Sequence, residues 1–204
     1  LRLGRRTLPG HVRAAAGALN LPVRVIRRDI VRRCGPLGGI YTALKTTRAE
    51  AVIFLACDMP FVSPALLRRL LRDFGTARND LFVRESGRSG FPCILRRTAL
   101  PVVADEIAHG RLSLQALAKK LNARSLRLPR VFSRELRNIN TPADWQRVRK
   151  LWDNSAAGNR AESNPLHHRE GREARKHQDR GVVAGRGGGG QDAGGDPPAA
   201  AVAL

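Results

Sequence analysis

A run of six consecutive apolar residues, 51–56 (AVIFLA), is the strongest structural signal in this chain, and Cys57 and Asp58 end it. An apolar run without polar alternation is typical of a strand buried on both faces, as in a parallel sheet covered by helices. No stretch of the chain approaches the roughly 18 apolar residues that a membrane-spanning helix requires. We therefore expect a soluble protein, with no membrane partner, built around a buried sheet.

Strand and helix signals alternate around this run. Residues 21–26 have the pattern of a short strand, and the turn-forming cluster 35–39 (GPLGG) leads into a helix that opens at Ile40. Ser63 and Pro64 mark a further helix start, because serine caps free amides and proline is tolerated at the first helical position. This order predicts an α/β fold on a mostly parallel sheet.

The remaining elements follow the same alternation until the large apolar residues nearly vanish after Trp152. The sequence predicts strands at 81–84, 91–95 and 125–128, and helices at about 98–109, 114–121 and 142–152. We divide the chain into an irregular basic lead-in (1–20), a folded domain (21–152) and a disordered low-complexity tail (153–204). The adjacent His167 and His168 lack ordered partners in such a tail and are not interpreted as a metal site.

The charge of the chain is strongly positive and lies in its first three quarters. Lys and Arg number 37 against 17 Asp and Glu, which gives a formal net charge of +20. Such a field attracts nucleic acid, anionic membranes or small phosphorylated substrates. Because few aromatic residues are available to stack bases, we favour solvated helix faces over a nucleic-acid-binding stripe.

The three cysteines, Cys34, Cys57 and Cys93, have no CxxC spacing. A disulfide framework or a zinc site is disfavoured, and a reducing, cytoplasmic location fits better. Because Cys57 directly follows the apolar run, we expect it to behave as a small buried hydrophobic residue.

Two strand ends carry candidate functional residues. In an open α/β sheet, ligands bind beyond the carboxyl ends of the strands. Asp58 follows the buried strand, where a carboxylate can bind a hard divalent cation or can simply begin a turn before Pro60. Asp29 and the glycine cluster follow the strand at 21–26, where glycines and a helix N-terminus can cradle an anion or form a tight turn without a ligand.

Three segments together resemble the molybdenum cofactor guanylyltransferases. They are residues 29–44, which end in GPLGGIYTAL, residues 52–71 (VIFLACDMPFVSPALLRRLL) and residues 138–145 (NINTPADW). Their order and spacing agree with the family, and the resemblance covers about residues 21–152. It implies the nucleotidyltransferase fold, a Rossmann-like three-layer sandwich with a mostly parallel sheet.

The resemblance also implies Mg²⁺-dependent transfer of GMP from GTP to molybdopterin, with release of pyrophosphate. Asp58 matches the family's metal-binding aspartate and would be its catalytic residue. The nucleotide would be bound by Asp29, Gly35 and Gly39, although an ungapped count from Val25 in some relatives places Arg28 at the acidic position. Asn138 and Asn140 match asparagines of the pterin side, or they close the loop before the helix cap at Thr141. Molybdenum-insertion or molybdoenzyme-maturation proteins are the implied protein partners.

The chain departs from the family at its start. Nothing in residues 1–20 resembles the family's glycine-rich loop, LAGGxSxRMGxDK in outline, and no lysine precedes Lys45. We expect a missing amino-terminal strand to leave a central position of the sheet open. The alternatives are a sequence truncated at its start, a non-catalytic binding module of the same fold, a cytidylyltransferase acting on the same pterin, and a nucleic-acid-binding protein.

Overall fold

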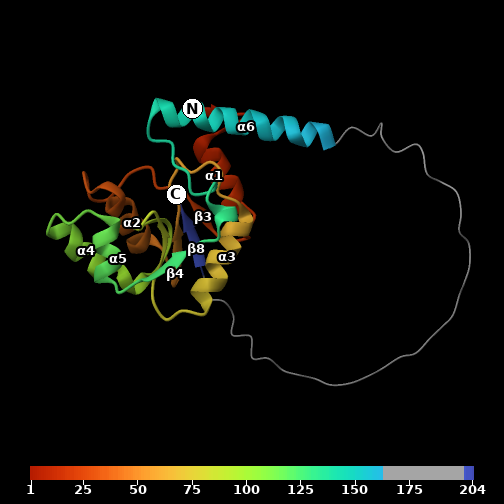
Figure 1. Ribbon diagram of the computed structural model, residues 1–204. Helices are drawn as coiled ribbons and strands as arrows, with labels where there is room; N and C mark the ends of the chain where they lie inside the picture. The colour runs from red at the N-terminus through yellow and green to blue at the C-terminus, as the bar shows by residue number, and fades with distance from the viewer. Residues whose placement is uncertain (163–199) are drawn as a thin grey trace, which may run out of the picture.

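The computed structural model describes residues 1–162 and 200–204, with only the backbone given for 154–162. The fold has three layers, a central sheet and a layer of helices on each of its faces (Figure 1). The six strands lie in the order β3-β8-β4-β6-β5-β7. Strand β6 is antiparallel to both of its neighbours, and the other pairs are parallel. The predicted α/β fold with a mostly parallel sheet is confirmed. The strands are β3 (Val23–Arg24), β4 (Ala51–Phe54), β5 (Leu81–Glu85), β6 (Arg88–Arg96), β7 (Arg124–Arg127) and β8 (Ala200–Ala203).

Helices cover both faces of the sheet and create two apolar cores (Figure 1). One core lies under α1 (Leu8–Gly17) and α3 (Pro64–Gly75). The other lies under α2 (Gly35–Thr46), α4 (Leu100–Ala108) and α5 (Leu114–Lys120). A third, small cluster joins the hairpin of β1 (Arg2–Leu3) and β2 (Arg6–Thr7) to α6 (Pro142–Glu162). Two single-turn 3₁₀ helices, η1 (Arg97–Ala99) and η2 (Arg130–Phe132), complete the elements.

The two elements with the clearest sequence signals fold as expected. All four residues of β4 are buried, because helices cover it on both sides. Ser63 caps α3 by accepting a hydrogen bond from the Leu66 amide at 3.1 Å. The helix then buries Leu66, Leu67 and Leu70, each worth about 1.5–3 kcal/mol. The strand β4 and the helix α3 therefore hold the residues between them, 55–63, in a fixed place.

The expected irregular lead-in at residues 1–20 is wrong. Thr7 accepts a hydrogen bond from the Gly10 amide at 3.2 Å and so caps α1. Val12 and Ala16, four residues apart on one helical face, are fully buried against the core. The short residues of this helix hid its amphipathic pattern.

The expected disordered tail at 153–204 is corrected at both of its ends. The helix α6 continues to Glu162, and residues 200–203 form the strand β8. The expectation for 163–199 lies outside the described residues. The central position that we expected to be open is filled, because β8 lies between β3 and β4 and is parallel to both.

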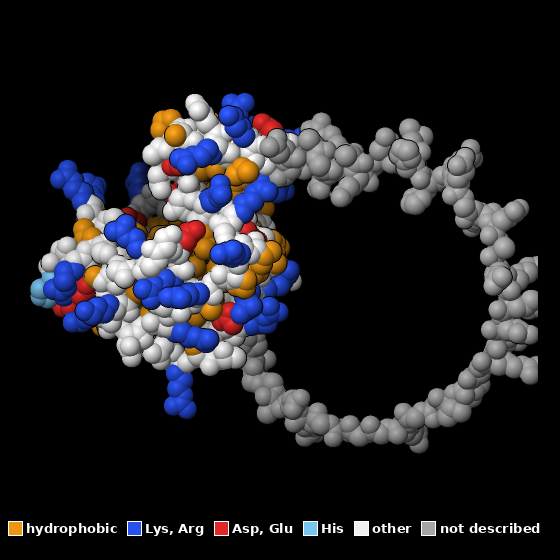
Figure 2. Space-filling model, in the orientation of Figure 1, with side chains coloured by type: hydrophobic (Ala, Val, Ile, Leu, Met, Phe, Trp, Pro, Cys, Tyr) orange, Lys and Arg blue, Asp and Glu red, His pale blue; other side chains and the backbone are white. Residues whose placement is uncertain are grey.

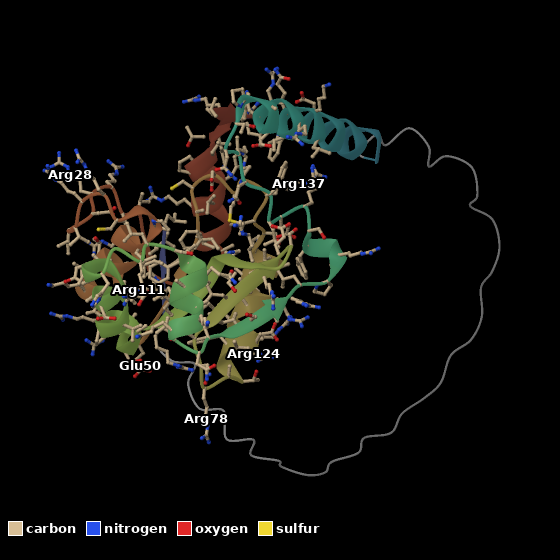
Figure 3. The ribbon with its side chains drawn as sticks, turned by 60° about the vertical axis from the view of Figure 1, so that its left-hand side comes forward. Arg28, Glu50, Arg78, Arg111, Arg124 and Arg137 are labelled. Atoms are coloured by element: carbon tan, nitrogen blue, oxygen red, sulfur yellow. The ribbon has the colours of Figure 1, made fainter. Side chains whose placement is uncertain are left out.

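Within the described residues, no helix is both long enough and apolar enough to cross a bilayer. Lysine and arginine side chains are distributed over the visible face and do not gather in one stripe (Figure 2). Arg28 lies at the opposite end of the molecule from Arg78 and Arg124 (Figure 3). This distribution favours solvated surfaces over a nucleic-acid stripe.

Candidate functional site

Asp58 lies in the loop between β4 and α3, beyond the end of the buried strand. Its Oδ1 atom is buried and has no hydrogen-bond partner among the described residues. Burial raises the pKa of this carboxyl group, because the charged form loses solvation. A buried carboxylate oxygen without a partner costs free energy unless a ligand satisfies it.

A magnesium ion fits this donor chemistry. Mg²⁺ prefers one or two carboxylates together with phosphate oxygens and water. In the part of the chain that the structure describes, no three His, Cys, Asp or Glu side chains gather in a metal-binding arrangement. Asp58 would therefore hold the ion together with oxygens from a bound phosphate.

The glycine cluster 35–39 is not a loop before a helix, as we expected, but the first turns of α2. Gly35 has a φ of +51°, a conformation that glycine adopts without strain. Gly38 lies against Asp29, because a Cβ atom at this glycine would be 2.6 Å from Oδ2 of that aspartate. The Asp29 carboxylate thus lies at the N-terminal end of α2, where a helix favours negative charge.

Thr42 connects the Asp29 loop to α2. Its hydroxyl accepts a hydrogen bond from the Ile30 amide at 2.9 Å and donates one to the Gly38 carbonyl at 2.8 Å. The side chain is only 4% exposed, so these bonds are shielded from water. Thr42 therefore determines where the Asp29 loop rests on the helix. Arg28, which precedes Asp29 in the chain, is exposed and points outward (Figure 3). Asp29 and not Arg28 therefore faces the glycines.

A pocket of about 210 Å³, the Asp29 pocket, opens beside this helix end. Asp29, Gly35 and Gly39 line it on the α2 side. Its other walls come from the ends of β4 and β8 and from Phe91. No lysine or arginine is among its lining residues, so the pocket itself contributes no cationic side chain. The lining is Ile26, Asp29, Gly35, Pro36, Gly39, Ile40, Phe54, Leu55, Ala56, Cys57, Phe91, Ala203 and Leu204.

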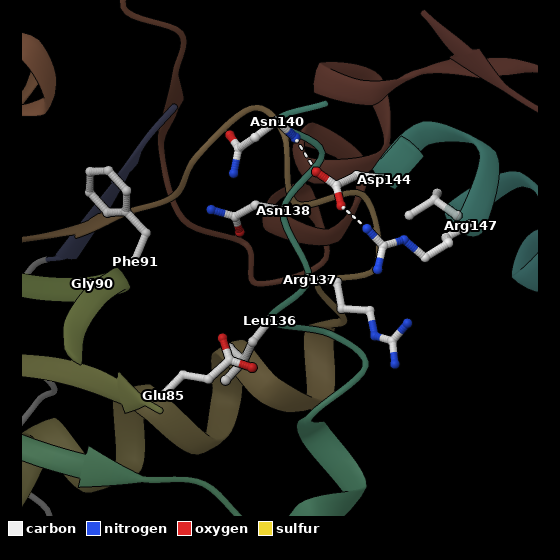
Figure 4. A pocket seen from close by; sticks show the side chains of 10 residues that line it. Glu85, Gly90, Phe91, Leu136, Arg137, Asn138, Asn140, Asp144 and Arg147 are labelled. Atoms are coloured by element: carbon white, nitrogen blue, oxygen red, sulfur yellow. Dashed lines mark hydrogen bonds and ion pairs between the residues drawn. The ribbon is translucent and has the colours of Figure 1, made fainter. Parts of the chain in front are cut away.

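A larger pocket of about 550 Å³, the Asn138 pocket, lies between β6 and the start of α6 (Figure 4). The amide side chains of Asn138 and Asn140 extend toward Phe91 on the opposite side. Glu85 and Arg137 also line the pocket. Burial raises the pKa of Glu85, and the positive charge of Arg137 opposes this effect. The pocket therefore offers amide, carboxylate and guanidinium groups to a polar heterocycle.

Hydrogen bonds join the loops that form the two pockets. The Ile139 amide donates to the Asp58 carbonyl at 3.0 Å, between the two asparagines. The Ser63 amide donates to Oε2 of Glu135 at 2.8 Å. Phe91 lines both pockets. Segments some eighty residues apart in the chain thus meet at Asp58.

The start of α6 fixes the position of the asparagine loop. As the sequence predicts, Thr141 caps the helix: its hydroxyl accepts from the Asp144 amide at 3.1 Å and donates to the Asp144 carboxylate at 2.8 Å. The backbone amide of Asn140 donates to the same carboxylate at 3.3 Å. The hydrogen bond from Thr141 lowers the pKa of Asp144. The carboxylate therefore stays ionised and holds the loop against the helix.

The structure places five of the six predicted site residues in two pockets, leaves Asp58 outside the lining of both, and adds further residues. Asp29, Gly35 and Gly39 share one pocket, Asn138 and Asn140 share the other, and Asp58 lies at the loop that joins them. Gly38, Thr42, Phe91 and Glu135 were not predicted. Only the GPLGG motif signalled Gly38, and the other three became recognisable through tertiary contacts.

Cys57 corrects one further expectation. Its side chain is exposed and lines the Asp29 pocket, although we expected it to be buried. Partial burial and the charge of Asp58 raise the pKa of the Cys57 thiol. The thiol is therefore less ionised than an ordinary cysteine, which makes it a poor nucleophile.

Comparison with known proteins places the chain among nucleotide-transferring proteins. The model of the MobA-like NTP transferase domain matches residues 8–125. A "Probable molybdenum cofactor guanylyltransferase" of Mycobacterium avium is 33% identical over 148 residues, which are 70% of this chain and 74% of that protein. The "Molybdenum cofactor guanylyltransferase" of Pseudomonas entomophila is 36% identical over 110 residues, 53% of this chain and 57% of that protein.

A solved structure supports the same fold. The crystal structure of molybdopterin-guanine dinucleotide biosynthesis protein A from Archaeoglobus fulgidus superposes with a TM-score of 0.65 at 20% identity, over 76% of this chain and 89% of that one. The chain spans about six tenths of the length of several curated relatives, with 57% for the Pseudomonas entomophila protein and 60% for that of Flavobacterium johnsoniae.

Proposed function

Because this chain belongs to the family of MobA-like NTP transferase domains, we propose that it transfers GMP from GTP to the terminal phosphate of molybdopterin or its molybdenum-loaded form. Pyrophosphate is the second product. One observation carries the proposal: two pockets of different chemistry both include Phe91, and their loops are bonded together at Asp58, whose carboxylate oxygen Oδ1 is buried and has no hydrogen-bond partner among the described residues.

The two pockets suit the two substrates. The Asp29 pocket takes the nucleotide, since its glycines allow the close approach of a planar base and sugar. The Asn138 pocket takes the pterin, because asparagine amides both donate to and accept from the ring edge. Phe91, which lines both, lies between the two ligands. We place their phosphates near Asp58, because its neighbour Cys57 lines the Asp29 pocket and its carbonyl accepts a hydrogen bond from Ile139 of the asparagine loop.

The reaction is an in-line displacement at the α-phosphorus of GTP. An oxygen of the acceptor's terminal phosphate forms the new bond, the bond from the α-phosphorus to the bridging oxygen breaks, and pyrophosphate leaves with that oxygen. The chain orients the reactants, and Asp58 would hold the metal. Bound Mg²⁺ would neutralise phosphate charge and the charge that develops on the leaving group. Because no cationic side chain lines the Asp29 pocket, this neutralisation would depend on the ion that Asp58 holds.

The proposal is tested with the purified chain, Mg²⁺, molybdopterin and either GTP or CTP. We expect pyrophosphate release that needs Mg²⁺ and acceptor together and that is faster with GTP. Faster release with CTP would identify a cytidylyltransferase. If nucleotide and pterin bind but no pyrophosphate is released with either nucleotide, the chain is a non-catalytic binding module of this fold.

Replacing Gly38 by alanine is expected to weaken GTP binding about 10-fold. The new Cβ atom would lie 2.6 Å from Oδ2 of Asp29, so this carboxylate has to move away from the helix end. The fold should tolerate the change, because the two closest atoms belong to the end of the Asp29 side chain and the backbone carbonyl of Val31 lies farther away, at 3.3 Å. Binding is measured by isothermal titration and stability by thermal unfolding.

Gly17→Ala is the matched control, because nothing lies within 4 Å of the Cβ atom that it adds at the end of α1. It should bind GTP as the parent chain does. Unchanged GTP affinity in the Gly38→Ala protein would contradict a role of Asp29 in the nucleotide pocket.

A further inference from the structure

The strand β8 reaches the middle of the sheet from the far end of the chain (Figure 1). On the β3 side, the Val202 amide donates to the Pro22 carbonyl at 2.8 Å, and the Leu204 amide donates to the Arg24 carbonyl at 3.0 Å. The Ile26 amide donates to the Leu204 carbonyl at 2.8 Å. This edge of β8 is therefore paired along its length.

The opposite edge of β8 pairs with β4. All four of its residues are in register with the four of β4, from Ala200 opposite Ala51 to Ala203 opposite Phe54. The Leu55 amide extends this ladder with a bond of 3.0 Å to the Ala203 carbonyl. Without β8, the facing edges of β3 and β4 would both present unpaired backbone groups.

The side chains of β8 alternate between the two cores. Val202 and Leu204, 1% and 9% exposed, belong to the core under α1 and α3. Ala203, 4% exposed, belongs to the core under α2 and α4. The strand β8 therefore places branched side chains in one core and a small side chain in the other.

The chain connects the other described strands to one another without passing through β8. The neighbouring strands β3 and β4 are linked through α2. Among the described residues, the strand that precedes β8 along the chain is β7, which lies at the edge of the sheet opposite β3. All described contacts of residues 200–204 are therefore with segments remote in sequence, like those of a separate peptide bound to a sheet.

We propose that the slot between β3 and β4 is a binding site for an extended peptide, and that residues 200–204 of the same chain are its ligand. Backbone hydrogen bonds on both edges supply affinity, and the alternating apolar side chains supply specificity. Covalent linkage raises the local concentration of the peptide, so a ligand of modest intrinsic affinity keeps the slot filled.

The ligand also completes the candidate nucleotide site, since Ala203 and Leu204 line the Asp29 pocket. This consequence, unlike the binding itself, rests on the proposed function. A filled slot is then a condition for nucleotide binding.

The test uses the full chain with a protease site introduced between residues 180 and 181. After cleavage, we expect the fragment that carries residues 200–204 to co-elute with the body in size-exclusion chromatography. A fluorescent synthetic peptide of residues 195–204 should enter the cleaved protein and be displaced by unlabelled peptide. The same peptide with Val202→Asp should compete at least about 10-fold more weakly.

A matched pair of valine substitutions in the uncut chain gives a second measurement. Val202→Asp should lower the melting temperature by at least about 5 °C. Val131→Asp, at a residue that is 77% exposed in η2, should leave it unchanged. If the Val202→Asp protein does not fold, the cleavage experiment on the unsubstituted protein still tests whether residues 200–204 bind the slot.

The proposal is overturned if the fragment separates after cleavage while the body keeps its melting temperature. Failure of the proposed function gives a different result: the fragment stays bound and the peptide exchanges, but GTP does not bind even when the slot is filled.

Discussion

Asp58→Asn is expected to reduce Mg²⁺-dependent pyrophosphate release about 100-fold or more, while the chain remains folded. The substitution removes the charge that would bind the metal and keeps the size of the side chain. The fold should tolerate the change, because the buried Oδ1 atom makes no hydrogen bond among the described residues that the substitution would break. Pyrophosphate release at saturating GTP measures the effect, and thermal unfolding measures stability.

Asp105→Asn is the control for this experiment. Asp105 lies on α4 and pairs with His109 and Arg111 at the surface, outside both pockets. Its substitution should leave turnover unchanged. Parental turnover in the Asp58→Asn protein would refute the metal-binding role of Asp58.

In the absence of metal, the raised pKa of Asp58 makes the stability of the folded chain depend on pH. The folded chain holds the proton of this carboxyl group to a higher pH than the unfolded chain does. The contribution of Asp58 to stability is therefore present at low pH and is lost as pH rises from about 4, the ordinary aspartate value, through the raised pKa. Relative to Asp58→Asn, the parent chain should lose melting temperature over this range. Added Mg²⁺ at pH 7 should raise the melting temperature of the parent alone.

Replacing Asn138 and Asn140 together by alanine is expected to lower kcat/KM for molybdopterin about 100-fold and to change GTP affinity less than twofold. Both amides face the Asn138 pocket, whereas neither is among the residues that line the Asp29 pocket. The two exposed side chains contribute little to stability, because Ile139 between them supplies the packing of this loop. Steady-state kinetics and GTP titration measure the two effects.

Asn79→Ala provides the comparison, because its exposed side chain lies outside both pockets and donates a hydrogen bond to the Asn122 carbonyl near the end of α5. It should not affect either substrate. Equal losses of GTP and molybdopterin use in the double variant would argue against a separate pterin pocket.

Much of the fold could be predicted from local patterns. The cap at Ser63, the proline after it and the spaced leucines predict α3 with its observed start and end. The continuous apolar run predicts β4, because only burial on both faces tolerates such a run. Thr141 with Asp144 likewise predicts the start of α6. These signals depend on interactions within a few residues, which sequence displays directly.

The sequence predicted which residues belong to the candidate site, but it did not predict how they are arranged. Asp29, Asp58 and Asn138 were identified by motif, but motifs do not reveal that the Ile139 amide binds the Asp58 carbonyl. They also do not show that Gly38 is needed because Asp29 lies against it. Thr42 had no signal, since a threonine inside a helix is ordinary until its partners are known.

Amino-acid order alone thus determined the helix caps, the buried strand and the choice of candidate residues, since each depends on short-range chemistry. Tertiary structure alone decided that Ala200–Ala203 fills the centre of the sheet. Four small apolar residues at the end of a long polar segment carry almost no local preference. Their place is set by two strands, over 20 residues apart, that both need a partner for their backbone groups.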